Sequence, residues 1–281
     1  MSPAQKDLPP SVSVPELPPA LRLSRQEIAS MLTTVSFARE MEIHQLIDST
    51  NLRAKAAAAE GVSHGYLVAA EEQTAGRGRM GRSFLSPPGA GVYLTYVLRP
   101  AVSPQKASMI TSLAAVAVAR AVEALCPVRV EIKWVNDLYL GSKKFCGILS
   151  EAGFGKDPNR LEYVVLGIGV NVLPMTFPPE LAEIATSLGN ETGLSLSRNQ
   201  LVAGISNQLE ALYGTLETGA FLPENRRRSN VLGRRVLVID GDRRFPAQAL
   251  EIDDQGRLIV RTDEGVVLPL GCGEVSLKIT E

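Results

Sequence analysis

The sequence lacks the features of several protein classes, beginning with closely spaced cysteines and an excess of charge. Its three cysteines, Cys126, Cys146 and Cys272, lie far apart and have no metal-ligand spacing. Because their number is odd, we expect no disulfide framework, and a reducing cytoplasm is the simplest compartment. The formal net charge of −1 leaves no global basic field for binding nucleic acid.

The sequence also lacks a long apolar run. A membrane-spanning helix needs about 20 consecutive apolar residues, and the best candidate, residues 107–119, is shorter and indicates a helix of small residues. The N-terminus lacks a basic segment followed by an apolar one, so we expect no signal peptide. Hydrophobic residues make up 45% and charged residues 21%, which is typical of soluble globular proteins. We therefore expect a cytoplasmic protein with no membrane partner.

The most informative segment is residues 76–82, Gly-Arg-Gly-Arg-Met-Gly-Arg. Glycine lets the backbone approach a ligand closely and adopt positive φ, and arginine presents a planar fork of donors suited to phosphate and carboxylate oxygens. The segment is neither a Walker loop nor a Rossmann fingerprint. It predicts a loop that wraps a multiply charged anion, although a mobile basic surface loop is the alternative for these residues alone.

Residue patterns divide the chain into three parts. Residues 1–35 form a Pro-rich N-terminal extension, whose first 21 or so residues we expect to be disordered or weakly ordered. Residues 36–228 alternate helix and strand signals, and residues 229–281 carry short β runs separated by turns, as in a small barrel or sandwich. We read Arg226–Arg228 as the linker. Helices are expected within 25–41 and at 52–60, 104–125 and 201–216, and strands at 66–70, 91–98, 128–134, 145–152, 161–172, 235–239, 247–252, 258–262, 266–270 and 275–279.

Polar clusters lie at the ends of the expected strands, where ligands tend to bind in mixed α/β folds. They comprise residues 49–51, 73–82, 133–137 and 143–147. Trp134 beside Asn136 would suit a flat heterocycle such as adenine, although a core tryptophan next to an exposed Lys133 is the alternative. Ser49 and Thr50 are also good N-caps for the following helix.

Four motifs in order resemble those of the biotin protein ligases: DSTN, GRGRMGRSF, KWVNDLYL followed by KKFCGILSE, and LGIGVNV. The resemblance runs from about Ser36 to Glu281. It implies an α/β (α+β) fold of the class II synthetase-like biotin/lipoate ligase type, with a mixed sheet, flanking helices and a small C-terminal SH3-like β-barrel. Met80 and Phe84 depart from the family pattern, which often has a charged residue and a tryptophan there. About forty residues precede the first motif, too few for the winged helix-turn-helix domain of dual-function members.

The resemblance implies ATP-dependent biotinylation of a lysine on a biotin carboxyl carrier protein through biotinyl-5'-AMP, with Mg²⁺ carried by ATP and no protein metal ligands assigned. Lys144 is expected to contribute most to catalysis, with its neighbour Lys143 outside the site, and Asp137 would orient Lys133 or assist the metal. Gly169 is expected to line the pocket through its backbone. The expected catalytic residues are Lys144, Arg77 and Arg79. The expected biotin-binding residues are Ser49, Thr50, Asn51, Gln73, Arg77, Gly78, Arg79, Lys144 and Gly147. The expected ATP-binding residues are Arg77, Arg79, Arg82, Phe84, Lys133, Trp134, Asn136 and Asn171.

Alternatives remain open at this point. A lipoate ligase or related acyltransferase would share the fold, and a biotin-sensing transcriptional regulator would need a DNA-reading helix, for which 23–38 is the only candidate and is short and mixed in character. A non-enzymatic scaffold would leave the Gly/Arg loop without a purpose. We expect no nucleic-acid partner, and edge pairing of a strand such as 161–172 would form a homodimer.

Overall fold

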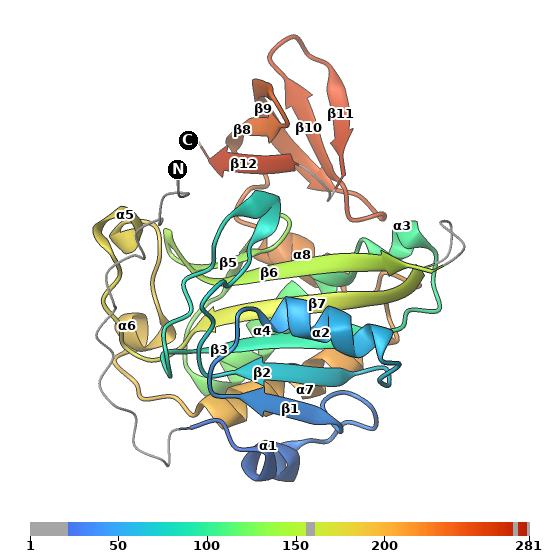
Figure 1. Ribbon diagram of the computed structural model, residues 1–281. Helices are drawn as coiled ribbons and strands as arrows, with labels where there is room; N and C mark the ends of the chain where they lie inside the picture. The colour runs from blue at the N-terminus through green and yellow to red at the C-terminus, as the bar shows by residue number, and fades with distance from the viewer. Residues whose placement is uncertain (1–21, 156–160, 272–274, 280–281) are drawn as a thin grey trace, which may run out of the picture.

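We describe the fold from a computed structural model, which describes residues 22–155, 161–271 and 275–279 (Figure 1). The expected disorder of residues 1–21, like Cys272, lies outside these ranges. The chain forms a large mixed sheet with helices on both faces and a smaller antiparallel sheet at the C-terminus, which confirms the predicted fold class.

The large sheet is 7-stranded, in the order β1-β2-β3-β7-β6-β5-β4. Only its edge pair, β1 and β2, is parallel, and the remaining neighbours are antiparallel. Because β7 lies between β3 and β6 with both edges hydrogen-bonded, the idea that 161–172 pairs across a dimer is wrong. The strands are β1 (Met41–His44), β2 (Tyr66–Ala70), β3 (Gly91–Leu98), β4 (Glu131–Lys133), β5 (Asp137–Leu140), β6 (Lys143–Phe154) and β7 (Leu161–Asn171).

Helices cover the two faces of this sheet unequally. The Ala-rich helix α2 packs on one face over β2, β3 and β7, whereas α4 and α7 pack together behind the other face (Figure 1). The small side chains of α4 allow this close packing, so that its first ten residues are all buried. The helices are α1 (Arg25–Met31), α2 (Thr50–Ala59), α3 (Pro104–Ala107), α4 (Ile110–Leu125), α5 (Pro179–Ala182), α6 (Leu188–Thr192), α7 (Arg198–Tyr213) and α8 (Leu222–Arg228).

The helical stretch Pro104–Leu125, comprising α3 and α4, is long and apolar enough to cross a membrane by length and composition. It includes residues 107–119, which we judged too short, and is longer than that apolar run. However, 72% of its most apolar window is buried inside the protein. Burial, rather than length, identifies it as a core helix.

The C-terminal domain is a 5-stranded antiparallel sheet in the order β11-β10-β9-β8-β12, as predicted from its short β runs. Gly241, Gly256 and Gly265 have positive φ at its tight turns, where glycine carries no Cβ penalty. The domain lies beside one edge of the large sheet (Figure 1). The strands are β8 (Arg235–Asp240), β9 (Arg243–Ile252), β10 (Leu258–Thr262), β11 (Val267–Leu270) and β12 (Val275–Ile279).

The arginines assigned to a linker belong instead to α8, which packs on α4. Arg228 pairs with Glu123 at 2.7 Å and with Glu224 at 2.9 Å, and Arg226 donates to the Ile252 carbonyl of the C-terminal domain at 2.6 Å. Clustered arginines look like a solvated linker in the sequence because their acidic partners are distant along the chain. The segment is therefore a helix with contacts to both domains, and not a stretch of chain without secondary structure between them.

Several other boundaries differ from expectation. The strand expected at 128–134 is shortened to β4, because Val130 donates its N–H to the Glu123 side chain rather than to a neighbouring strand. The strand expected at 145–152 begins earlier, since Lys144 of β6 already pairs with Tyr139 of β5. Helix α1, within the expected extension, packs on α7.

Candidate active site

A cavity of about 1060 Å³ lies between the large sheet, the Gly/Arg loop and the C-terminal domain. Every residue predicted to bind a ligand or to act in catalysis lines this cavity, although they come from segments up to 122 residues apart in sequence. The structure therefore brings the predicted residues together. These lining residues are Ser49, Thr50, Asn51, Gln73, Arg77, Gly78, Arg79, Arg82, Phe84, Lys133, Trp134, Asn136, Lys144, Gly147 and Asn171.

One end of the cavity is polar but uncharged, at the start of α2. The backbone N–H of Thr50 donates to Gln73 Oε1 at 2.9 Å, and Thr50 Oγ1 lies 3.0 Å from the same oxygen. Ser49 occupies the N-cap position but makes no side-chain cap hydrogen bond, and its buried hydroxyl has no partner. Plain N-capping therefore does not account for Ser49, and this hydroxyl is available to a ligand.

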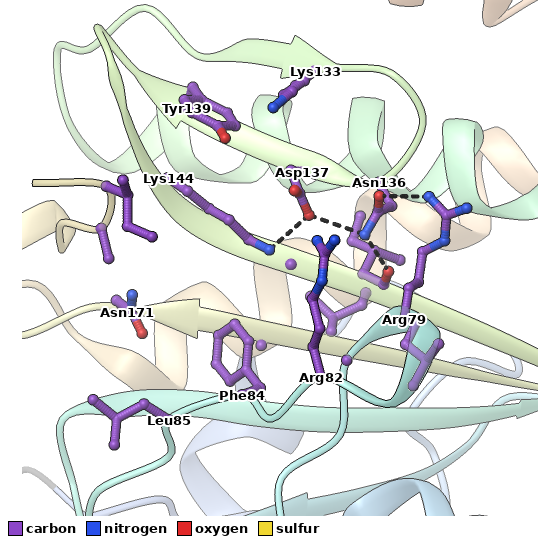
Figure 2. A pocket seen from close by; sticks show the side chains of 18 of the residues that line it. Arg79, Arg82, Phe84, Leu85, Lys133, Asn136, Asp137, Tyr139, Lys144 and Asn171 are labelled. Atoms are coloured by element: carbon purple, nitrogen blue, oxygen red, sulfur yellow. Dashed lines mark hydrogen bonds and ion pairs between the residues drawn. The ribbon is translucent and has the colours of Figure 1, made fainter. Parts of the chain in front are cut away.

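The Gly/Arg loop closes one side of the cavity. A Cβ on Gly76 would lie 2.4 Å from the Phe84 carbonyl oxygen, so only glycine fits where the two arms of the loop meet. Gly78 donates to the Arg82 carbonyl at 2.7 Å, and Met80 between them adopts φ 56°. This tight turn directs Arg79 across the cavity, where its guanidinium donates to Asn136 Oδ1 at 3.0 Å (Figure 2).

Lys144 and Asp137 form the charged centre of the cavity. Lys144 Nζ lies 2.7 Å from Asp137 Oδ1, which also accepts from Asn136 Nδ2 at 2.9 Å (Figure 2). The ion pair with Lys144 is a third role for Asp137, beside the two that we considered. The neighbouring Lys143 donates to the Ala182 carbonyl at 2.8 Å and does not line the cavity, as expected.

Positive charge dominates the rest of the cavity wall. Burial lowers the pKa of Lys133, and the nearby charges of Lys144, Arg82 and Lys278 lower it further, against the opposing effect of Asp137. Cations this close repel one another, so they favour an anionic ligand that neutralises them. The cationic side chains of the lining are Arg77, Arg79, Arg82, Lys133, Lys144, Arg234 and Lys278.

Two glycines in the central strands make room for the Phe84 ring. A Cβ on Gly169 would lie 2.6 Å from this ring, and one on Gly147 would lie 3.3 Å from it. Phe84 also meets Tyr93 edge to face, with 6.4 Å between ring centroids. The space beside Gly169 is therefore occupied by an aromatic ring.

Trp134 connects the site to the C-terminal domain. Its side chain is largely buried, at 5% exposure, and its indole N–H donates to the Gly256 carbonyl at 3.0 Å. Lys133 and Asn136 flank it and line the cavity. This contact matches the alternative of a core tryptophan better than a free stacking surface. Asn171 is buried as well and donates to the Thr186 carbonyl at 3.0 Å.

Sequence reasoning missed the contribution of the C-terminal domain to this site. Lys278 was inside a predicted strand, but no local signal indicates that β12 faces the cavity. The loop around α5 was missed for the same reason, since its apolar residues have no motif. The residues missed from these two regions include Asn230, Arg234, Leu277, Lys278, Ile279, Phe177, Leu181 and Ile184.

No group of three or more His, Cys, Asp or Glu side chains within the described ranges could hold a metal ion. Asp137 and Glu131 are nevertheless carboxylates of the cavity wall. Mg²⁺ usually binds one or two carboxylates together with substrate phosphates. The residues present therefore suit a Mg²⁺ ion that arrives with a nucleotide, and not one held in a protein cage.

Comparisons with known proteins agree with this geometry. The sequence model of the biotin/lipoate A/B protein ligase family matches residues 44–171, and that of the biotin protein ligase C-terminal domain matches residues 231–278. The bifunctional ligase/repressor BirA of Bacillus subtilis is 37% identical over 252 residues, covering 87% of this chain and 76% of the relative. The biotin--[acetyl-CoA-carboxylase] ligase of Mycobacterium tuberculosis is 32% identical over 228 residues, covering 78% and 82%. The structure of the biotin protein ligase from Aquifex aeolicus in complex with biotin and ATP is similar, with a TM-score of 0.74 and 26% identity, over 86% of this chain and all of that chain.

Proposed function

The chain belongs to the biotin protein ligase family, and we propose that it uses ATP to attach biotin to a lysine of a biotin carboxyl carrier protein. In the first step the biotin carboxylate attacks the α-phosphorus of ATP, so that biotinyl-5'-AMP forms and pyrophosphate leaves. In the second step the neutral amine of the acceptor lysine attacks the carbonyl carbon of the mixed anhydride. An amide bond forms, AMP leaves and the nitrogen releases a proton.

One observation carries this proposal: a single cavity joins an uncharged hydrogen-bonding end to a cationic centre. Biotin has the matching division, with a neutral ureido ring at one end and a carboxylate at the other. Ser49, Thr50, Asn51 and Gln73 would hold the ureido ring. The carboxylate would then reach the cationic centre, where it meets the α-phosphate.

The first step brings two anions together, so positive charge must screen their repulsion. Lys144 is the proposed main catalytic residue, because it lies at the centre of the cavity and Asp137 holds it there at 2.7 Å. Arg77 and Arg79 supply further charge from the loop. Such preorganised charge acts by positioning and by stabilising the transition state, without a covalent intermediate on the protein. Gly78 and Gly147 let the backbone approach the ligand closely.

We assign the nucleotide to the wall that faces the C-terminal domain. Lys133 and Arg82, with Lys278 and Arg234 of the C-terminal domain, are the cations there that can meet the phosphates. Phe84, Asn136 and Asn171 are proposed for the nucleoside, and Trp134 supports this wall through its contact with Gly256. When bound, Mg²⁺ would screen phosphate charge, with Asp137 or Glu131 as its protein contacts.

The proposal is tested by incubating the protein with biotin, Mg²⁺ and ATP labelled on the α-phosphate, with lipoate in a parallel reaction. We expect labelled adenylate and pyrophosphate with biotin only. Adenylate with lipoate only would identify a lipoate ligase and contradict the assignments of Ser49 and Gln73. Transfer to a purified carrier domain, detected by a mass increase on its lysine, tests the second step.

We further propose that the Gly/Arg loop closes over its ligands. The Arg77 side chain is 43% exposed, and Met80 as a whole residue is 49% exposed. The empty loop is therefore accessible to a protease. Closure would keep water from the reactive adenylate. Limited proteolysis should slow within residues 76–82 when biotin and ATP are added, and equal cleavage with and without them would contradict the idea.

The remaining partners follow from the same reaction. We propose a cytoplasmic enzyme, where ATP and carrier proteins are available, with no nucleic-acid partner. Residues 23–38 include α1, which packs against α7. A DNA-reading helix would instead project from the surface into the major groove. A gel shift at low salt tests this part. A homodimer is a further proposal, which needs an interface other than β7, and sedimentation at several concentrations tests it.

A further inference from the structure

Four oxygen atoms form a continuous row behind the uncharged end of the cavity. They are Asn51 Oδ1, Thr95 Oγ1, Thr50 Oγ1 and Gln73 Oε1, and the successive distances are 2.7, 2.9 and 3.0 Å. Thr50, Asn51 and Gln73 line the cavity, and Thr95 lies fully buried behind them in β3. The row is therefore part of the wall that a ligand meets.

Both ends of this row are held as acceptors by groups outside it. At one end the backbone N–H of Thr50 donates to Gln73, so the atom facing it must be the amide oxygen. The Gln73 amide nitrogen consequently faces Ser86 Oγ at 2.9 Å, and Ser86 can direct its own proton to the Phe84 carbonyl at 3.1 Å. Gln73 is thus fixed from within the loop.

At the other end the fixing group is the Glu151 carboxylate. It accepts from the Asn51 side chain at 2.9 Å, and because an ionised carboxylate can only accept, the Asn51 atom facing it must be nitrogen. Asn51 Oδ1 therefore points into the row. Lys55 at 2.7 Å and Arg77 at 3.7 Å surround the same carboxylate, and these contacts lower the pKa of Glu151 although burial opposes them.

The row is one proton short as a result. Its three oxygen–oxygen contacts need three hydrogens, but the two amide oxygens supply none and the two threonine hydroxyls supply one each. One contact must then place lone pairs against each other, which is unfavourable in a buried site. A ligand N–H aimed at one of these oxygens gives a hydrogen bond to the acceptor that the row leaves without one, whereas an apolar ring of similar size does not.

We propose that Glu151 is a positioning residue that sets the specificity of this site for a ligand with N–H donors, such as the cyclic urea of biotin. It acts through Asn51, because Glu151 does not itself line the cavity. The inference rests on the proposed function, since it explains how the same site distinguishes a ureido ring from the dithiolane ring of lipoate. Glu151 also links the Gly/Arg loop to this wall, because Arg77, the first arginine of the loop, lies 3.7 Å from its carboxylate.

Gly167 in β7 supports this arrangement. A Cβ there would lie 2.1 Å from Asn51 Oδ1, a distance that real Cβ atoms do not show. Gly167 pairs with Thr95 in β3 and with Leu149 in β6, so the gap it leaves is beside the row. The missing side chain makes the space that the Asn51 amide occupies.

The test compares binding of biotin with binding of biotin methylated on a ureido nitrogen, by calorimetry. The wild-type protein should bind biotin at least about tenfold more tightly than the methylated compound, the loss expected for one buried hydrogen bond. In Glu151→Ala the Asn51 amide is free to turn, so biotin should bind about tenfold more weakly and the preference over the methylated compound should shrink towards one. Glu151→Gln, which is nearly isosteric and can turn its own N–H₂ towards Asn51, should give a smaller change of the same kind.

The control is Glu60→Gln on the end of α2, which removes another ion-paired carboxylate, 2.8 Å from Arg53 and away from the cavity. It should leave both affinities unchanged. The KM of adenylate formation for biotin should rise in Glu151→Ala more than kcat falls. A general loss of folding would weaken both ligands equally, and if Glu151→Ala does not fold, Glu151→Gln provides the measurement.

Two outcomes separate the proposals. If the wild-type protein does not bind biotin and does not form biotinyl-5'-AMP, the proposed function is contradicted. If the wild-type protein binds biotin and both Glu151 variants keep the wild-type preference for biotin over its methylated form, only the role of Glu151 is overturned.

Discussion

Replacing Lys144 with methionine removes a charge from the centre of the cavity while keeping the length of the side chain. Lys144 Nζ is 2.7 Å from Asp137 Oδ1, so the ammonium is already held in place before a ligand arrives. The side chains of this pair are 31% and 23% exposed. Because partly exposed ion pairs contribute only about 0–1 kcal/mol, we expect little change in the free energy of unfolding.

The effect on adenylate formation should be much larger. A charge about 4 Å from a phosphate oxygen contributes on the order of 4 kcal/mol at an effective dielectric constant near 20. Removing one preorganised donor costs about 3 kcal/mol in measured cases, or roughly a hundredfold in kcat. Asp137 would also lose its counter-charge and face the incoming anions, which acts in the same direction.

The assay is the rate of pyrophosphate release with saturating biotin and ATP. Lys143→Met is the matched control, since Lys143 is adjacent in sequence but donates to the Ala182 carbonyl outside the cavity. Lys143→Met should keep near-normal rates. Normal adenylate formation by Lys144→Met, or an equal loss in both variants, would refute the placement of Lys144 at the reacting centre.

Three further results are expected. Gly169→Ala should weaken ligand binding, measured by calorimetry, more than it lowers the melting temperature, because its Cβ would lie 2.6 Å from the Phe84 ring and displace it into the cavity. Trp134→Phe should cost about 1–3 kcal/mol of stability and raise the KM for ATP, since it removes the indole donor to Gly256. In the wild-type protein, the fluorescence of this single tryptophan should shift to the red when denaturant detaches the C-terminal domain. Burial raises the pKa of Glu210, but hydrogen bonds from one hydroxyl and three backbone N–H groups lower it by more. The pKa of Glu210 therefore lies below its ordinary value of 4.5. The stability that this carboxylate contributes is present above that value and is lost as pH falls through the lower folded pKa. Glu210→Gln should therefore melt below the wild-type protein at about pH 7, and the difference should shrink as the pH is lowered below 4.5.

Most helices and strands were predictable because their signals are local. The strand 66–70 and the strand 258–262 have the predicted bounds, since β-favouring residues there are flanked by turn residues. The errors lie where a distant side chain decides. Arg226–Arg228 was taken for a linker because its partners, Glu123 and Asp254, are far away in sequence.

The site was predictable to the extent that residue types carry chemistry. Glycine and arginine in one loop indicate an anion, and the predicted residues do share one cavity. Their contacts were not predictable in the same way. Asp137 was expected to meet Lys133 or a metal, but its ion pair with Lys144 was not expected, because it depends on the register of β5 against β6.

The sequence by itself determined the family, the two-domain order of the fold and the residues that gather at the site, because each of these depends on residue types and their spacing. Only the tertiary structure decided how those residues interact: that Trp134 joins the domains, that β12 completes the cavity with Lys278, and that Glu151 orients Asn51. Hydrogen bonds and ion pairs depend on distances of about 3 Å between atoms. Segments separated by a hundred residues reach such distances only once the sheet has assembled them.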